Sequence, residues 1–250
     1  MTLLERITNK VTWADSLQIM KRLPDKSIRL IVTDPPYGLN YNDGEDLAKI
    51  RERAFGGDKS KMKPRPIEGD GEVEALELFK KFLIEAKRLL TPNGGCCCCC
   101  GGGGPKPLFA QWTLLMDKYL HFKHAVVWDK GGLGMGFHYR RNYEFMLVAQ
   151  RGNTCIWNGG NTTSNVFRLG KIIPSAEQHP TIKPIELMEH FIRLHSNEGD
   201  TILDPFAGSF TTAIAAIRLK RNFICIEKKL AYVKIGRQRI KNEISQLKLF

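Results

Sequence analysis

The chain has 250 residues, 42% of them apolar and 26% charged, a size and composition typical of one ordinary globular domain. Disorder and a fibrous architecture are disfavoured, because the apolar content is ordinary and no fixed repeat runs through the sequence. No apolar run approaches the ~18 residues of a membrane span, and no secretory signal opens the chain, so we expect a cytoplasmic protein without membrane contact.

Basic residues dominate the charge, with 38 Lys and Arg against 26 Asp and Glu and a pI of about 9.4. This balance favours a polyanionic partner. The excess is concentrated in residues 51–65 and 211–250. Each of these patches alone is as readily a solvated surface, so charge by itself names no reaction.

The first strong pattern is the apolar, β-branched run IRLIVT at residues 28–33, which predicts a buried strand. Asp34, Pro35, Pro36 and Tyr37 follow it, at the carboxyl end where open α/β sheets place ligands. Residues 38–69 are rich in Gly, Pro and charge and too long for a simple connection, so we interpret them as a mobile binding loop.

An amphipathic helix is predicted next, because apolar residues recur at three- and four-residue steps between Val73 and Leu90. A turn at Pro92 to Gly95 and the five consecutive cysteines Cys96 to Cys100 follow. Zinc sites need separated ligand pairs, and free Cys packs as a small hydrophobe, so we interpret this run as a buried strand with no metal.

Strands and helices alternate in the second half. Helices are predicted at 108–120, 184–195 and from 211, strands at 125–128, 145–148, 201–203 and 223–226, and a basic helix at the end. Residues 152–178 are polar and irregular. Such alternation predicts an α/β fold with a mostly parallel sheet and helices on both faces.

One segment of this half has the layout of a Rossmann-like nucleoside site. Strand 201–203 leads to the turn Asp204 to Ser209, a helix of small residues follows, and the next strand ends at Glu227. A glycine turn without a ligand is the alternative. The fingerprint GxGxxG is absent, which weakens a nicotinamide or flavin interpretation and with it an oxidoreductase.

Three motifs, DPPY at 34–37, HPTIKP at 179–184 and DPFAGS at 204–209, together resemble the DNA amino-methyltransferases that use S-adenosylmethionine. DPPY precedes the cofactor motif, as in the permuted β-class of that family. The resemblance implies a Rossmann-like methyltransferase fold with circularly permuted motif order, built as one domain over residues 1–250.

The resemblance also implies roles for individual residues. The catalytic group would be Asp34, Pro35, Pro36 and Tyr37. The cofactor would be held at its adenine end by Asp15 and Ser16, at its ribose by Glu227, around its methionine by Asp204, Pro205, Phe206, Ala207, Gly208, Ser209 and Thr211, and at its carboxylate by His179, Thr181 and Lys183.

The implied substrate is double-stranded DNA, methylated at adenine N6, with cytosine N4 as the nearest alternative. We expect residues 131–178 to recognise the target, and the DNA contacts to come from Lys61, Lys63, His138, Arg140 and Arg141. An unrelated basic surface is the alternative for the paired arginines. A restriction–modification partner endonuclease and a homodimer are left open.

Phe210 departs from the family, which usually has glycine at this position. The large side chain must pack into the core beneath the following helix or narrow the cofactor cleft. We expect the first, because the rest of DPFAGS and the threonines after it are intact. The second would indicate a catalytically impaired nucleic-acid-binding relative.

Overall fold

A computed structural model describes residues 1–36, 71–100, 108–132, 140, 142–170 and 182–247. Within this part of the chain, eight strands form one sheet in the order β1-β8-β7-β2-β3-β5-β4-β6. The strands are β1 (Lys10–Trp13), β2 (Ile28–Thr33), β3 (Leu90–Cys100), β4 (His121–Asp129), β5 (Tyr143–Gln150), β6 (Val166–Arg168), β7 (Thr201–Asp204) and β8 (Asn222–Glu227).

The sheet is mixed but mostly parallel. Strands β1, β8, β7, β2 and β3 pair in parallel, whereas β5 runs antiparallel to both β3 and β4. The carboxyl ends of β2 and β7 therefore meet at one edge of the sheet. The α/β class predicted from the alternating pattern is confirmed.

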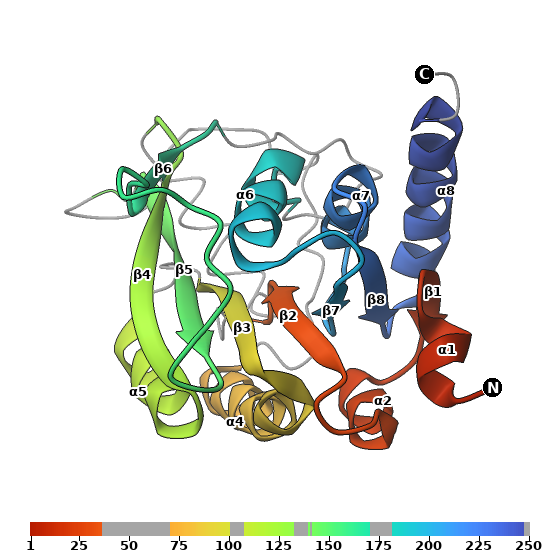
Figure 1. Ribbon diagram of the computed structural model, residues 1–250, viewed down its shortest axis with the longest axis horizontal. Coiled ribbons are helices and arrows are strands. Elements are labelled where there is room, and N and C mark those ends of the chain that lie inside the picture. Colours follow the sequence, from red (N-terminus) through yellow and green to blue (C-terminus); the bar gives the residue numbers. More distant parts are fainter. Residues whose placement is uncertain (37–70, 101–107, 133–139, 141, 171–181, 248–250) are drawn as a thin grey trace, which may run out of the picture.

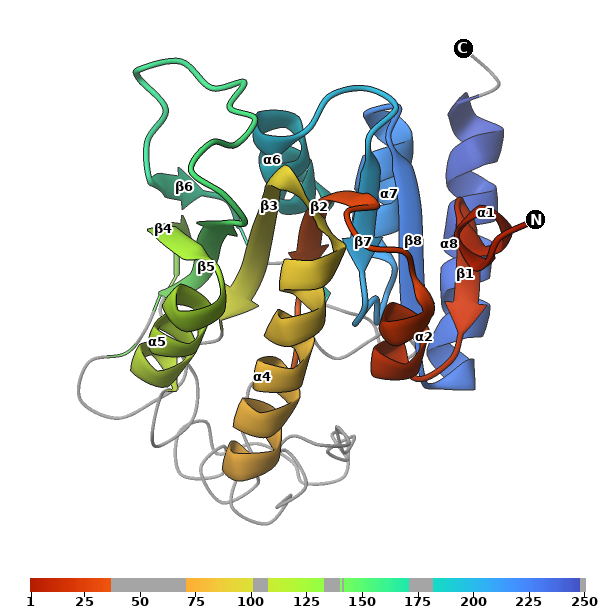
Figure 2. The ribbon, with the colours of Figure 1, turned by 60° about the horizontal axis from the view of Figure 1, so that its bottom comes forward.

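Helices cover both faces of the sheet (Figures 1 and 2). The apolar faces of α2 (Ser16–Arg22), α4 (Glu72–Leu89) and α5 (Phe109–Tyr119) share one buried cluster, which also takes Ile7 of α1 (Leu3–Ile7). On the other face, α6 (Ile185–His195), α7 (Thr211–Arg218) and α8 (Leu230–Leu247) bury the second cluster.

The cysteine run is a central strand, as predicted. Its side chains alternate between the faces: Cys96, Cys98 and Cys100 pack with α4 and α5, and Cys97 and Cys99 face α6 and α7. All five are free and buried, and they pack as small hydrophobes. Burial raises the pKa of the Cys97, Cys98, Cys99 and Cys100 thiols, to about 12 at Cys100, so these four are neutral.

The prediction of a turn at Pro92 to Gly95, before the strand, is wrong. These residues lie inside β3, and the pairing with β2 shifts there, since Leu90 lies opposite Ile28 whereas Gly95 lies opposite Leu30. The extra residues are accommodated as an irregularity within the strand rather than as a turn before it.

The sequence patterns did not predict the amino-terminal elements α1, β1 and α2. They have 5, 4 and 7 residues, too few for periodicity to be read. Strand β1 nevertheless adds the edge next to β8, with Trp13 opposite Glu227. The same shortness explains why β6 was assigned to an irregular stretch.

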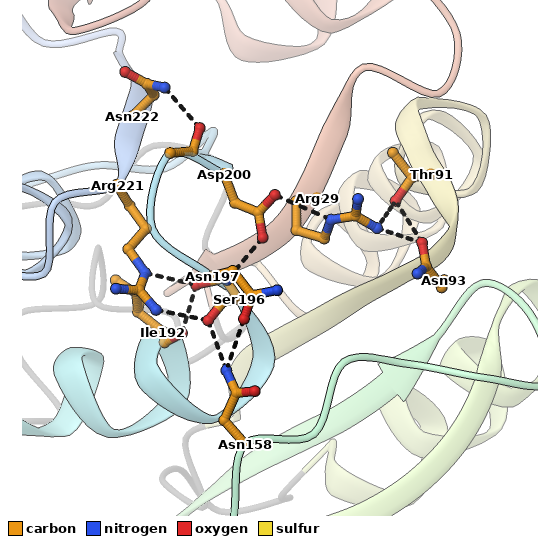
Figure 3. A network of polar contacts seen from close by, with 11 residues as sticks. Arg29, Thr91, Asn93, Asn158, Ile192, Ser196, Asn197, Asp200, Arg221 and Asn222 are labelled. Atoms are coloured by element: carbon orange, nitrogen blue, oxygen red, sulfur yellow. Dashed lines mark hydrogen bonds and ion pairs between the residues drawn. The ribbon is translucent and has the colours of Figure 1, made fainter.

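A polar network closes the amino ends of the strands (Figure 3). Arg29 of β2 contacts Asp200 at 3.3 Å, and Arg221 donates to the Ser196 carbonyl at 2.6 Å. The Asn158 amide donates to that same carbonyl at 2.9 Å, so it fixes the predicted recognition segment to the end of α6. This network lies at the opposite end of the strands from the three motifs.

Among the residues placed in the structure, no helix combines the length and the apolar character that crossing a membrane needs.

Candidate active site

The first and third motifs meet at the carboxyl ends of the neighbouring strands β2 and β7. Asp34 directly follows β2, and Asp204 is the last residue of β7. The Thr33 hydroxyl donates to Asp204 Oδ1 at 2.6 Å and so bridges the two strand ends. The structure thereby brings the predicted catalytic and cofactor motifs together, although 170 positions of sequence separate their aspartates.

Asp34 lies in a cluster of alternating charges. The Lys183 ammonium is 2.8 Å from Asp34 Oδ2 and 3.5 Å from Glu144 Oε2, and the other Glu144 oxygen pairs with Lys130. The Lys183 side chain is 6% exposed, and those of Asp34 and Glu144 are 20% and 18% exposed. Four charged groups from four segments therefore neutralise one another in a largely buried site.

The pKa directions follow from this arrangement. Burial raises the pKa of Asp34, and the Lys183 ammonium opposes that rise. Burial disfavours the charged form of Lys183, but Asp34 and Glu144 outweigh it and raise its pKa. Burial likewise works against ionised Glu144, but Lys183 and Lys130 lower its pKa. Lys183 and Glu144 are thus held in their charged forms.

Asp204 is held by neutral hydrogen-bond donors instead, and no cation pairs with it among the described residues. Its Oδ1 accepts from the Thr33 hydroxyl and, at 3.1 Å, from the Phe206 N–H, and the residue is 4% exposed. Burial raises its pKa to about 6. Its hydrogen bonds fix the first residues of the turn after β7, so Asp204 acts as a brace for that turn.

The turn is tied to Glu227 at the end of β8. The two carboxylate oxygens accept from the N–H groups of Gly208 at 2.9 Å and Lys229 at 2.7 Å, and burial raises the Glu227 pKa. Gly208 has a φ of 47°, a conformation that favours glycine. The predicted ribose carboxylate and the predicted methionine turn thus form one unit.

The remaining residues of the turn are mostly buried. Ser209 and Thr211 share a hydrogen bond of 3.0 Å between their hydroxyls, and Ala207 bonds through its N–H to Ile226. Phe206 is half-buried, with its ring edge against Phe82. Their contacts support the turn, and their roles toward a cofactor stay predictions, as does that of Pro205.

Phe210 packs into the core, as expected. It is fully buried among the apolar residues of α6, α7 and α8, and its ring fills the space beside Gly236, where an added Cβ would lie 2.1 Å from Phe210 Cδ2. Its φ of 62° explains why glycine suits this position. In this chain, the burial of the Phe210 ring stabilises the residue in a left-handed backbone conformation.

Asp15 and Ser16 begin α2 just beyond the edge strand. Asp15 caps the helix, since its Oδ1 accepts from the Gln18 N–H at 3.0 Å. The preceding residue, Ala14, donates to the Glu227 carbonyl at 3.2 Å. Asp15 therefore lies near the Glu227 strand end, and its role toward the cofactor's adenine stays a prediction.

Several predicted residues lie outside the described part of the chain. They are Tyr37, Lys61, Lys63, His138, Arg141, His179 and Thr181, together with the predicted mobile loop at 38–69. Of the catalytic tetrapeptide, Asp34, buried Pro35 and half-buried Pro36 are described, and Arg140 is exposed. In the described ranges, no group of three potential metal ligands occurs.

Sequence reasoning missed three residues of this site: Thr33, Lys130 and Glu144. The sequence could have pointed to Glu144, because it is the one charged residue of the mostly apolar strand β5, YEFMLVAQ. Lys130 directly follows β4 and closes the hairpin by donating its N–H to the Asn142 carbonyl. Their proximity to Asp34 depends on the pairing of distant strands, which no local pattern gives.

Comparison with known proteins agrees with this geometry. Residues 153–238 match the sequence model of a family described as DNA methylase. Over this part of the sequence the chain is similar to that family. It is 27% identical to the Type II methyltransferase M2.DpnII of Streptococcus pneumoniae, over 92% of this chain and 88% of the relative.

Two further relatives extend the likeness. DNA adenine methyltransferase YhdJ of Escherichia coli is 27% identical over 90% of this chain and 80% of its own. The crystal structure of the M1.HpyAVI–SAM complex superposes with a TM-score of 0.63 at 24% identity, covering 92% of this chain and 98% of that one. The chain therefore has the Rossmann-like methyltransferase fold that the motifs predicted.

Proposed function

We propose that this protein transfers a methyl group from S-adenosylmethionine to the exocyclic N6 of an adenine in DNA. The observation that carries the proposal is the Thr33–Asp204 hydrogen bond of 2.6 Å, which sets the end of the DPPY strand beside the end of the DPFAGS strand. A nucleophile held at the first motif and a methyl donor held at the second would thus be neighbours. The adenine-specific name of the YhdJ relative favours adenine over cytosine.

The amino group needs activation because its lone pair is delocalised into the ring. In the proposed mechanism, Asp34 and the Pro35 carbonyl accept hydrogen bonds from its two N–H groups, which favours a pyramidal nitrogen with an available lone pair. Asp34 and Pro35 would hold this nitrogen while S-adenosylmethionine supplied the methyl group, with the electron pair of the broken S–C bond staying on sulfur. The proton lost from nitrogen passes to Asp34 and on to water.

The residues present fit the cofactor. When bound, S-adenosylmethionine supplies a sulfonium methyl group that is already activated for transfer. Glu227, at the end of β8, offers the carboxylate that ribose hydroxyls need, and it is fixed through Gly208 to the turn that would surround the methionine. Much of the rate would come from this positioning, since no covalent protein intermediate is needed.

The relatives are named as methyltransferases that act on DNA, and this supports DNA as the substrate of the present chain. The target base would leave the duplex to reach Asp34, and Tyr37 would offer a face for stacking. Phosphate contacts are proposed for Arg140, Arg141, His138, Lys61 and Lys63, with residues 131–178 reading the sequence. The net charge of +12 supports such contacts.

The test is methylation of DNA by the purified protein with labelled S-adenosylmethionine, followed by mass spectrometry of the nucleosides. N6-methyladenine is expected, and N4-methylcytosine instead would select the alternative. The absence of both from DNA carrying all short sequence contexts, together with a protein that binds no cofactor in calorimetry, would favour the impaired relative. Sequencing the product with base-modification detection would give the recognition site.

Two finer assignments belong to the same proposal. A partner restriction endonuclease is suggested by the Type II methyltransferase among the relatives, and a homodimer would extend the short recognition segment. Sedimentation of the protein with and without DNA tests the dimer, and a paired endonuclease requires that the methylated site resist a nuclease of the same cell.

A further inference from the structure

The lysine that contacts the catalytic aspartate is shared with a second carboxylate, Glu144, to which nothing above assigns a role. We propose that Glu144 is a positioning residue for methyl transfer: by sharing Lys183 with Asp34, it keeps the Asp34 carboxylate available to the target amino group. This inference rests on the proposed function.

The geometry gives Glu144 two distinct contacts. One carboxylate oxygen pairs with Lys130, whose ammonium also lies 4.9 Å from the centre of the Trp128 ring. The other, Oε2, is buried and has no hydrogen-bond partner within the described residues, but lies 3.5 Å from Lys183 Nζ. Lys130 therefore fixes Glu144, and the second oxygen acts on Lys183 by charge.

The chemistry explains why this sharing matters. Positive charge develops on the target nitrogen during transfer, and an ammonium committed only to Asp34 would oppose it at close range. Lys183 Nζ is 2.8 Å from Asp34 Oδ2, in a site where burial strengthens electrostatic interactions. The negative charge of Glu144 offsets part of the Lys183 charge. Asp34 consequently keeps more of its basicity and its power to accept hydrogen bonds.

A purely structural ion pair is the competing explanation, and the chain contains a matched example of one. Glu243 of α8 pairs with Arg218 of α7 at 2.7 and 3.1 Å, and its side chain is 10% exposed. This pair joins two helices and has no contact with Asp34. Glu243→Gln therefore reports what the loss of a buried paired carboxylate does to stability alone.

The first experiment follows the Asp34 carboxyl by carbon NMR during a pH titration of the full chain without cofactor or DNA, with assignment from Asp34→Asn. Glu144→Gln is expected to move the titration to lower pH, since a neighbouring negative charge is lost. Lys183→Met should move it to higher pH, and Glu243→Gln should leave it in place. Among the described residues, the charged or titratable groups that act on Asp34 or on which it acts include Lys183, Glu144, Lys130, Asp204, Cys99 and Cys100.

The second experiment measures single-turnover methyl transfer at saturating cofactor and DNA. Glu144→Gln is expected to lower the rate by about ten- to a hundredfold, a range typical of small misplacements in an active site. Its Kd for S-adenosylmethionine should stay near that of wild type, and the acid limb of its pH–rate profile should move to lower pH. Glu144→Asp, which keeps the charge on a shorter side chain, should recover part of the rate.

The outcomes separate the two proposals. An Asp34 titration unmoved in Glu144→Gln, or a Glu144→Gln rate equal to wild type, would overturn the positioning role while leaving the methyltransferase assignment intact. A wild-type protein that methylates no DNA would overturn the proposed function, and the NMR titrations would still report whether Glu144 and Lys183 act on Asp34 in opposite directions.

Discussion

The dipeptide Asp-Pro occurs at the ends of two neighbouring strands, and its aspartate has a different environment in each. At the end of β2, Asp34 is paired with the ammonium of Lys183. At the end of β7, Asp204 accepts hydrogen bonds from the Thr33 hydroxyl and the Phe206 N–H, with no cation paired to it in the described chain. Burial thus raises the pKa of both aspartates, but only at Asp34 does a paired ammonium oppose that rise.

The difference between these two environments indicates which aspartate is suited to catalysis. A brace needs only fixed acceptors, which Asp204 supplies to Thr33 and to the turn before α7. A group that must accept a proton or hold a substrate needs tuned charge, and Lys183, Glu144 and Lys130 supply it around Asp34. Each prediction below tests one side of this contrast.

The largest effect is expected at Asp34. Asp34→Ala should lower methyl transfer by about a thousandfold, in the range reported for loss of a proton-accepting group. Binding of S-adenosylmethionine should be nearly intact, because the carboxylate contacts the target amino group and not the sulfonium. Single-turnover kinetics and calorimetry on the same preparation measure the two quantities, and near-normal turnover would refute the mechanism.

The next largest effect is a loss of stability, expected for a change at Phe210, which follows the turn that Asp204 braces. Phe210→Gly should lower the free energy of unfolding by about 3–5 kcal/mol of lost packing, offset by about 1–2 kcal/mol because glycine adopts the left-handed φ without strain. Urea unfolding measures the stability, and a cofactor titration should show little change in affinity.

Gly236→Ala is the matched variant for Phe210. In wild type its added Cβ would lie 2.1 Å from Phe210 Cδ2, so overpacking should destabilise the protein, whereas the same change in the Phe210→Gly background should be tolerated. A Phe210→Gly protein as stable as wild type that binds cofactor far more tightly would instead mean that the ring obstructs the cleft.

How much of this could be predicted from sequence depends on the range of each signal. The β2 and β7 strands, the helices α4 to α8 and the cysteine strand have local patterns, and each was predicted in type. The apolar runs before them placed Asp34 and Asp204 at strand ends, and the resemblance of their motifs to one family assigned them to one site. Glu144 lies opposite Trp128 in the sheet and 3.5 Å from Lys183 Nζ. These contacts depend on the pairing of distant segments, which no local pattern gives.

Phe210 shows the same limit in packing. Its burial followed from its size, but the space that accepts it is made by the absence of a side chain at Gly236, 26 positions later on α8. Glycine inside a helix ordinarily weakens it. Only the tertiary contact shows why glycine fits there.

The contrast between the two aspartates also predicts a pH dependence. Burial raises the pKa of Asp204 to about 6 in the folded protein, above its ordinary value. The stability contributed by this shift is fully present below the unfolded pKa of about 3.9 and is lost as pH rises through about 6. At neutral pH the ionised group therefore opposes folding by about 3 kcal/mol, as an order of magnitude.

Asp204→Asn removes this ionisation while keeping an acceptor for Thr33 and Phe206. Its free energy of unfolding relative to wild type should increase between pH 4 and pH 7, by up to about 3 kcal/mol. Denaturant unfolding of both proteins at several pH values gives the difference. A constant difference across that range would mean that Asp204 ionises in the folded protein as it does in the unfolded chain.

The smallest predicted effect concerns Glu227, which separates a binding role from a structural one on the cofactor side of the site. Glu227→Ala should weaken the binding of S-adenosylmethionine by about 1–3 kcal/mol, the range for hydrogen bonds to charged groups. The change also removes the acceptor for the Gly208 and Lys229 N–H groups, so part of the loss would come from a looser turn. Glu227→Gln keeps one oxygen acceptor, and its affinity for S-adenosylmethionine should lie between those of Glu227→Ala and wild type.

Calorimetric titration of the three proteins, with Asp34→Ala as the variant that keeps binding, measures the effect. A dissociation constant unchanged in Glu227→Ala would mean that this carboxylate only joins the end of β8 to the turn, and the ribose would then need another partner.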